Sequence, residues 1–212
     1  MKISAISKTI DEWSGSVIIA GILEETIGRQ ILLFNSILNE SRLIERFKDA
    51  KFQGKKNQKL SIELIEGNIK KIVFVGLGSA EKLLINDLRI ATSIGVRQCI
   101  GYEDKLGIFF PWDALDPSSA ALAIGQAVRL TSFKDLRFQS EPKEFTKIKE
   151  VELIGLDKNT NSAILEINPI CEGVEFARKL VAAPPNILTP NKLAEESERL
   201  AKDFNLDFKI LD

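Results

Sequence analysis

The run Ile72-Val-Phe-Val-Gly-Leu-Gly78 constrains the fold of this chain more than any other stretch. It is apolar throughout, and a continuous apolar run of this length is typical of a strand that is covered on both faces. The residues that follow it recur at helical spacing: Leu84, Leu88, Ala91 and Gly95. A buried strand followed by an amphipathic helix predicts an α/β fold, because each face of such a sheet needs a layer of helices.

The remaining sequence repeats this pattern of strands and helices. We expect further strands at residues 2–7, 17–22, 60–64, 106–110 and 151–155. One or two helices are expected within 29–47, and another opens at Asp116-Pro117, where aspartate suits the N-cap and proline suits the first helical position. The predicted architecture is therefore an α/β sheet with helices on both faces, although chain order does not determine strand order.

Near its end the chain is predicted to form two helices joined by a proline turn. The first helix carries Ile170, Val174, Ala177 and Val181 on one face and ends before Pro184-Pro185, because proline lacks a backbone donor. Thr189-Pro190 then starts the second helix. Its predicted buried stripe consists of Leu193, Ala194, Ser197, Leu200, Ala201 and Phe204. A last strand is expected to carry Leu206, Phe208 and Ile210 on one side.

The joining segment also carries a specific string of residues. It reads Ala177-Arg178-x-Leu180-Val181-x-x-Pro184-Pro185-Asn186-x-Leu188-Thr189-Pro190-x-x-Leu193-Ala194. This string resembles the segment that links the amino-terminal and catalytic domains of leucyl aminopeptidases, the cytosolic leucine aminopeptidase family, although many members have Asn where this chain has Ala182. Weaker similarity lies at Val73–Gly78, at Asp87-Leu-Arg-x-Ala91 and at Ala123-x-Gly125-x-Ala127-x-x-Leu130.

The resemblance implies a domain organisation. Residues 1–165 would form an amino-terminal domain similar to the macro-domain fold, with a mixed sheet. Residues 166–185 would be the joining helix and proline turn, and residues 186–212 the beginning of a truncated catalytic domain.

The resemblance also implies an activity for the intact protein. It would be a cytoplasmic, homohexameric hydrolase that uses two divalent metal ions, manganese or zinc, to release amino-terminal residues from peptides. The family holds these ions in motifs such as Asn-Thr-Asp-Ala-Glu-Gly-Arg-Leu, of which only Asn159-Thr160-Asn161 has a counterpart here. Asp203, Asp207 and Asp212 are interpreted as solvated surface residues. We therefore expect no catalytic, cofactor-binding or metal-binding residue and no peptidase activity in this chain; the amino-terminal part would serve assembly and positioning.

Composition excludes several classes of site. The chain has no histidine, so Ser-His-Asp and Cys-His catalysis and histidine-ligated zinc are ruled out. Its two cysteines, Cys99 and Cys171, lie on apolar helical faces without CxxC spacing and are interpreted as core thiols. The net charge of -1 offers no electrostatic reason to bind nucleic acid or a membrane surface.

The glycines that end the strongest strand leave an alternative function open. A dinucleotide fingerprint would need a third glycine where Glu81 stands, so Gly76 and Gly78 are interpreted first as a tight strand exit. A stand-alone, macro-like module could instead hold a nucleotide or ADP-ribose in a glycine-edged cleft near them. The lysine-rich stretch Lys48 to Lys59 could form a phosphate patch, but a solvated loop is favoured.

Overall fold

The computed structural model describes residues 1–38, 40, 42–140 and 147–211. The chain divides into two compact units. The first comprises Met1–Phe133 and Lys143–Cys171, and the second comprises Lys134–Pro142 and Glu172–Asp212. The division falls inside one helix, and the predicted limits of an amino-terminal domain at residues 1–165 stay a prediction. No helix of the described residues is long and apolar enough to cross a membrane.

The first unit is built on one six-stranded sheet in the order β1-β6-β5-β2-β4-β3. The strands are β1 Lys2–Ile6, β2 Val17–Leu23, β3 Lys59–Glu63, β4 Lys71–Gly78, β5 Lys105–Phe109 and β6 Glu150–Ile154. All pairings are parallel except that of the edge strand β3 with β4. Every residue of β2 is buried, as its continuous apolar run predicts for a central strand. The prediction of a mixed α/β sheet is confirmed.

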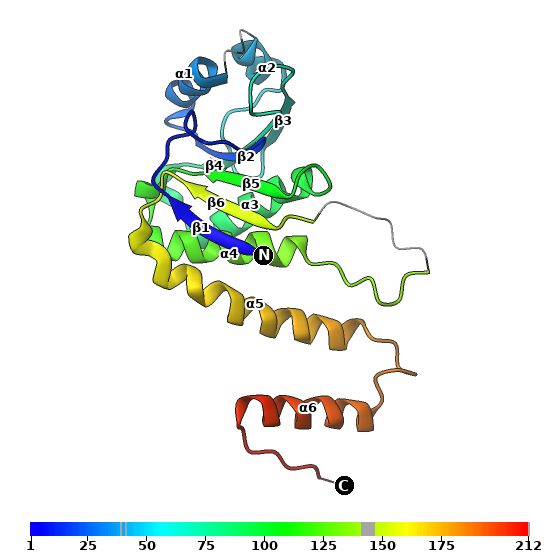
Figure 1. The fold of residues 1–212 in the computed structure, drawn as a ribbon. Coiled ribbons are helices and arrows are strands. Elements are labelled where there is room, and N and C mark those ends of the chain that lie inside the picture. Colours follow the sequence, from blue (N-terminus) through cyan, green and yellow to red (C-terminus); the bar gives the residue numbers. More distant parts are fainter. Residues whose placement is uncertain (39, 41, 141–146, 212) are drawn as a thin grey trace. The chain divides into compact units, whose positions relative to one another are not determined.

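Helices cover both faces of this sheet (Figure 1). The helices α1 Ile27–Leu38 and α2 Leu43–Asp49 lie on one face, and α3 Ile85–Cys99 and α4 Pro117–Ser132 lie on the other. The predicted start of α4 is confirmed, because the Asp116 carboxylate accepts a hydrogen bond of 2.8 Å from the Ser119 amide and Pro117 follows at the first helical position. Short 3-10 turns occupy Ala80–Lys82, Trp112–Ala114 and Lys158–Thr160.

Each face of the sheet has its own core. Under α1 and α2, Phe34 meets the edge of Phe74 at a centroid distance of 5.1 Å, and Phe47 contacts the same ring at 4.7 Å. Under α3 and α4 the helices approach the sheet closely through small residues. A Cβ on Gly95 would come within 2.6 Å of Ile19, so that glycine lets α3 approach β2.

The helix α5 Asn161–Ala182 ends where the proline pair predicts. It starts well before Ile170 and includes Pro169. Its first half belongs to the first unit, in which Ile164, Ile167 and Cys171 are buried.

In the second unit, α6 Pro190–Phe204 forms as expected, but its predicted buried stripe is wrong. Only Ala201 of that stripe is buried, whereas Leu193 and Phe204 are 44% and 68% exposed. The periodicity defines an apolar face correctly, but the described part of the chain covers only some of it: Ala201 is buried, and Ala194 and Ser197 are half-buried.

The predicted last strand is also wrong. Residues 205–211 contain no strand, and Leu206, Phe208 and Ile210 are all exposed. Alternation of apolar residues predicts a strand only where a neighbouring strand can satisfy its backbone groups. The structure provides no such neighbour within the described residues.

Candidate functional site

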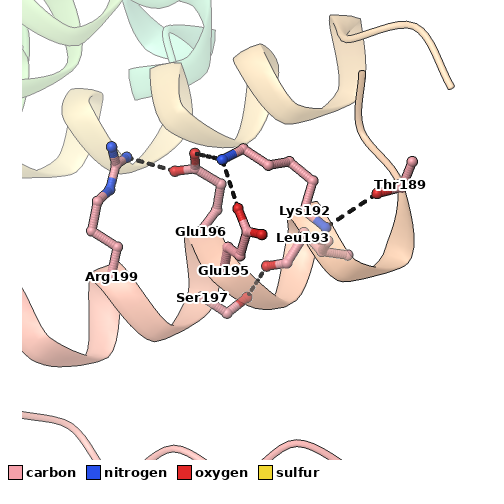
Figure 2. Close-up of polar contacts among 7 residues, drawn as sticks. All are labelled: Thr189, Lys192, Leu193, Glu195, Glu196, Ser197 and Arg199. Carbon is pink, nitrogen blue, oxygen red and sulfur yellow. Dashed lines mark hydrogen bonds and ion pairs between the residues drawn. The ribbon is translucent and has the colours of Figure 1, made fainter. Parts of the chain in front are cut away.

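The proline turn that carries the family-like string is held by backbone hydrogen bonds. The carbonyl oxygen of Pro184 accepts from the amides of Ile187 and Leu188 at 2.9 and 3.0 Å. The next helix is capped as predicted: the Thr189 hydroxyl accepts a 3.2 Å hydrogen bond from the Lys192 amide, and Pro190 takes the first helical position. Figure 2 shows this cap at the start of α6. The turn is therefore a rigid connector whose polar groups serve its own backbone.

One side of α6 carries a set of ion pairs (Figure 2). Lys192 lies 2.8 Å from Glu195 and 3.8 Å from Glu196, and Arg199 lies 2.6 Å from Glu196. The hydrogen bond to Glu195 raises the pKa of Lys192 above its ordinary value. Pairs of this kind at helical spacing support the helix only slightly, because water screens them. They form a polar face opposite an apolar one, as in a helix that packs against another domain.

The carboxyl end of β4 is closed where the alternative function would need a glycine-edged cleft. A Cβ on Gly76 would lie 2.0 Å from the carbonyl oxygen of Lys55, so the loop after α2 rests directly on this glycine. The Gly76 amide donates to Gln58 O at 2.9 Å, and the Gly78 amide donates to Gly54 O at 2.8 Å. Phosphate would need those amides and that space. The two glycines thus form a tight strand exit, and Gly78 has a φ of +81°.

The lysine-rich loop is tied to the neighbouring helix. Lys56 forms an ion pair of 2.6 Å with Asp87, which also accepts a 2.9 Å hydrogen bond from the Leu84 amide at the start of α3. Partial burial opposes ionisation of Asp87, but the hydrogen bonds from Lys56 and Leu84 outweigh it and lower the pKa of the carboxyl group. Lys51 and Lys55 are exposed to solvent, so the loop does not gather its cations into one site.

The remaining candidate groups are the two cysteines and the carboxylates near the carboxyl end of the chain. Burial raises the pKa of the Cys99 thiol to about 12, which keeps it protonated and inert, and Cys171 is fully buried. Among the described residues, no group of three or more Asp, Glu or Cys side chains lies close enough to hold a metal ion. Asp203 and Asp207 are exposed, and Asp212 lies outside the described residues. The described residues therefore offer no ligand set for a two-metal centre, and the expectation that the whole chain has none stays a prediction.

Comparison with known proteins gives a consistent picture. A sequence profile described as the cytosol aminopeptidase family, N-terminal domain, matches residues 32–142. A probable cytosol aminopeptidase of a Prochlorococcus marinus strain is 43% identical over 211 residues, which are 100% of this chain and 42% of that protein. A probable cytosol aminopeptidase of a Synechococcus strain is 38% identical over 213 residues, covering 100% of this chain and 43% of that protein.

Solved structures share the fold. A mutant of tomato leucine aminopeptidase superimposes with a TM-score of 0.84 at 24% identity, over 97% of this chain and 43% of that one. The bottromycin maturation enzyme BotP in complex with Mn gives a TM-score of 0.66 at 19% identity, over 91% of this chain and 37% of that one. In each case this chain spans less than half of the protein that it matches.

Proposed function

The chain belongs to the cytosol aminopeptidase family, and on that premise we propose that it is the amino-terminal part of a metal-dependent aminopeptidase that releases amino-terminal residues from peptides. The observation that carries this proposal is the match of the whole chain, at 43% identity, to 42% of a probable cytosol aminopeptidase. A sequence match over the full length of the chain is more specific than a shared fold, which hosts many functions.

The metal chemistry belongs, in this proposal, to the part of the relatives that this chain does not span. A two-metal hydrolase needs several convergent oxygen ligands. The described residues provide no such group. We therefore assign no step of peptide hydrolysis to these side chains and expect the 212-residue chain to be inactive alone.

The role that we assign to these residues is positioning and assembly. The apolar face of α6 and the exposed side chains of Leu206, Phe208 and Ile210 form a surface that a further domain could bury. Complete burial of each such side chain contributes about 1.5–3 kcal/mol. The first unit, which has a core on each face of its sheet, would contribute to a cytoplasmic homohexamer of the intact protein.

A fusion experiment tests this function. Residues 1–212 are joined to the remaining length of the Prochlorococcus relative, and hydrolysis of leucine amide is measured with and without Mn²⁺ or Zn²⁺. We expect metal-dependent hydrolysis by the fusion and none by the 212-residue chain under the same conditions. Hydrolysis by the chain alone would contradict the assignment of the chemistry to the missing part.

Two further measurements on the fusion separate positioning from chemistry. Sedimentation should give a hexamer, and a stable active monomer would argue against the assembly role. The double variant Leu200→Asp/Phe204→Asp should impair activity by preventing α6 from docking, whereas Lys202→Asp on the same helix should leave it close to the parent. Equal activity of the parent fusion and both variants would show that the apolar face of α6 is not a docking surface.

A further inference from the structure

A hollow of about 430 Å³ lies at the carboxyl ends of β2 and β5, within the first unit. After β2 the chain enters α1 on one face of the sheet, and after β5 it enters α4 on the opposite face. Open α/β sheets bind ligands where the chain leaves two neighbouring strands toward opposite faces of the sheet. The volume also lies in the range of small-molecule sites. The hollow therefore has the place and size of a binding site, while the glycine edge beside it is closed.

Two buried oxygen atoms in the wall of this hollow have no hydrogen-bond partner among the described residues. They are Oγ1 of Thr26 and Oε1 of Gln30. The amide group of Gln30 is oriented by its Nε2, which donates to the Gly21 carbonyl at 3.4 Å. Its Oε1 is thus an acceptor without a donor. Each atom has less than 1 Å² of exposed surface, so a ligand would reach it only after its side chain turns toward the hollow. Buried polar atoms are normally satisfied, and such a turn toward a hydrogen-bond donor would satisfy this pair.

The charged residues of the lining are one cation and one anion. Arg29 lies on α1 beside Gln30, and Asp113 lies in the 3-10 turn after β5. Both are exposed at the rim, where water and ligands can reach their charged groups. Between them the wall is apolar, with Leu23 and Phe109 among its residues. A ligand that matches this lining carries both charges on an apolar body.

Phosphate groups fit these surroundings poorly. The amide of Ala80, which also lines the hollow, already donates to the carboxylate of Glu25 at 3.2 and 3.3 Å. Glu25 accepts a 2.5 Å hydrogen bond from the Ser79 hydroxyl, which lowers the pKa of Glu25 and keeps it negative. Glu25, which is not itself in the lining but binds the lining residue Ala80, adds a second negative charge to that of Asp113, against the single cation Arg29 of the lining. A nucleotide would add negative charge where the protein already has an excess of it.

We propose that this hollow binds a small zwitterion with an apolar side chain, namely an α-amino acid or a short peptide. The ligand carboxylate pairs with Arg29. The ligand ammonium donates to the Asp113 carboxylate and, once the Gln30 and Thr26 side chains turn toward the hollow, to Gln30 Oε1 and the Thr26 hydroxyl oxygen, while the ligand side chain packs on Leu23. Such molecules are the substrates and products of the proposed activity, but binding by this chain does not depend on that activity.

The test is calorimetry of the 212-residue chain with L-leucine, Leu-Gly, N-acetyl-leucine, leucinamide and AMP. Saturable binding of leucine or Leu-Gly is expected, and whichever binds more tightly identifies the free amino acid or the peptide as the ligand. Removing the ammonium charge, as in N-acetyl-leucine, or the carboxylate charge, as in leucinamide, should weaken binding about tenfold or more. No saturable binding of either zwitterion up to about 10 mM, or tighter binding of AMP, would overturn the proposal.

Variants connect the binding to the two rim charges. Arg29→Gln should weaken leucine binding about tenfold but leave leucinamide unchanged, and Asp113→Asn should leave N-acetyl-leucine unchanged while weakening leucine. Gln30→Met removes the orphan acceptor at similar size and should also weaken leucine. Arg46→Gln, an exposed arginine on α2 outside the hollow, is the matched control. Loss of binding in the control, or full binding in Arg29→Gln and Asp113→Asn, would refute this site.

Discussion

Substituting Gly76 by alanine is the sharpest test of how the carboxyl end of β4 is closed. The added Cβ would lie 2.0 Å from the Lys55 carbonyl oxygen and 2.8 Å from the carbonyl carbon and oxygen of Gly54. All three contacts are with backbone atoms, so no side chain can rotate away. The loop must move instead, which breaks the hydrogen bond between the Gly78 amide and Gly54 O.

The expected cost follows from that geometry. Adding a methyl group to a well-packed site costs typically about 1–3 kcal/mol, and a backbone clash belongs at the upper end. For a chain of this size, about 3 kcal/mol lowers the melting temperature by roughly 6–12 °C. Gly28→Ala is the control, because a Cβ at Gly28 on α1 has no neighbour within 4 Å. It should leave stability unchanged or raise it slightly, since alanine has a higher helix propensity than glycine.

The assay is urea unfolding followed by circular dichroism, with the midpoint and slope of each variant compared with those of the parent chain. If Gly76→Ala unfolds within about 0.5 kcal/mol of the parent, the loop does not rest on this glycine as described. An open cleft at the glycine edge would then become the better interpretation, and nucleotide binding there would regain its structural basis.

Three other perturbations have equally specific outcomes. Burial of Glu152 raises its pKa, but hydrogen bonds from Lys105 at 2.9 Å and Trp13 at 2.7 Å prevail and lower it. The ionised Glu152 carboxylate therefore stabilises the fold fully above its unfolded-state pKa near 4.5, and this stabilisation is lost as the pH falls through the lower folded-state pKa. Glu152→Gln should reduce the fall of the unfolding free energy at acid pH. An unchanged pH dependence would contradict this. Hydrogen exchange should find the amides of residues 207–211 unprotected and those of β2 strongly protected, and equal protection would show that the tail is paired. The Cys99 thiol should react with Ellman's reagent only at the rate of unfolding, and rapid reaction in the native state would show that it is accessible.

Much of the first unit could be predicted because its signals are local. A strand buried on both faces, such as β2, must be apolar throughout, and a helix start such as Asp116-Pro117 uses a side-chain acceptor and a fixed φ within two residues. These features depend on neighbouring residues in the sequence. The strand order and the antiparallel placement of β3 depend on long-range pairing, and no local pattern encodes them.

The errors concern features that depend on distant residues. Leu206, Phe208 and Ile210 alternate as a strand would, yet no strand lies beside them among the described residues. The two glycines at the end of β4 left a cleft open as an alternative to a tight strand exit, and the loop at Gly54–Lys55 fills that space.

The proposed binding hollow escaped prediction for the same reason. The sequence predicts a helix from about Arg29 but no role for Arg29 or Gln30, and Asp113 lies far from them in the sequence. The only local signal was a glutamine and an arginine on the first turn of α1, which is common on exposed helices. Only the sheet brings these residues to one place.

The position of β1 at the edge of the sheet has a consequence for synthesis on the ribosome. Lys2 bonds to Glu150 across 148 positions, and β6 is the only strand that pairs with β1 among the described residues. At about 5–20 residues per second, β1 waits on the order of ten to thirty seconds for its partner. By contrast, β3 and β4 are consecutive strands and can pair as soon as both emerge. The pairing of β1 therefore waits for β6, and this unit can be native only after β6 and the first half of α5 have been made.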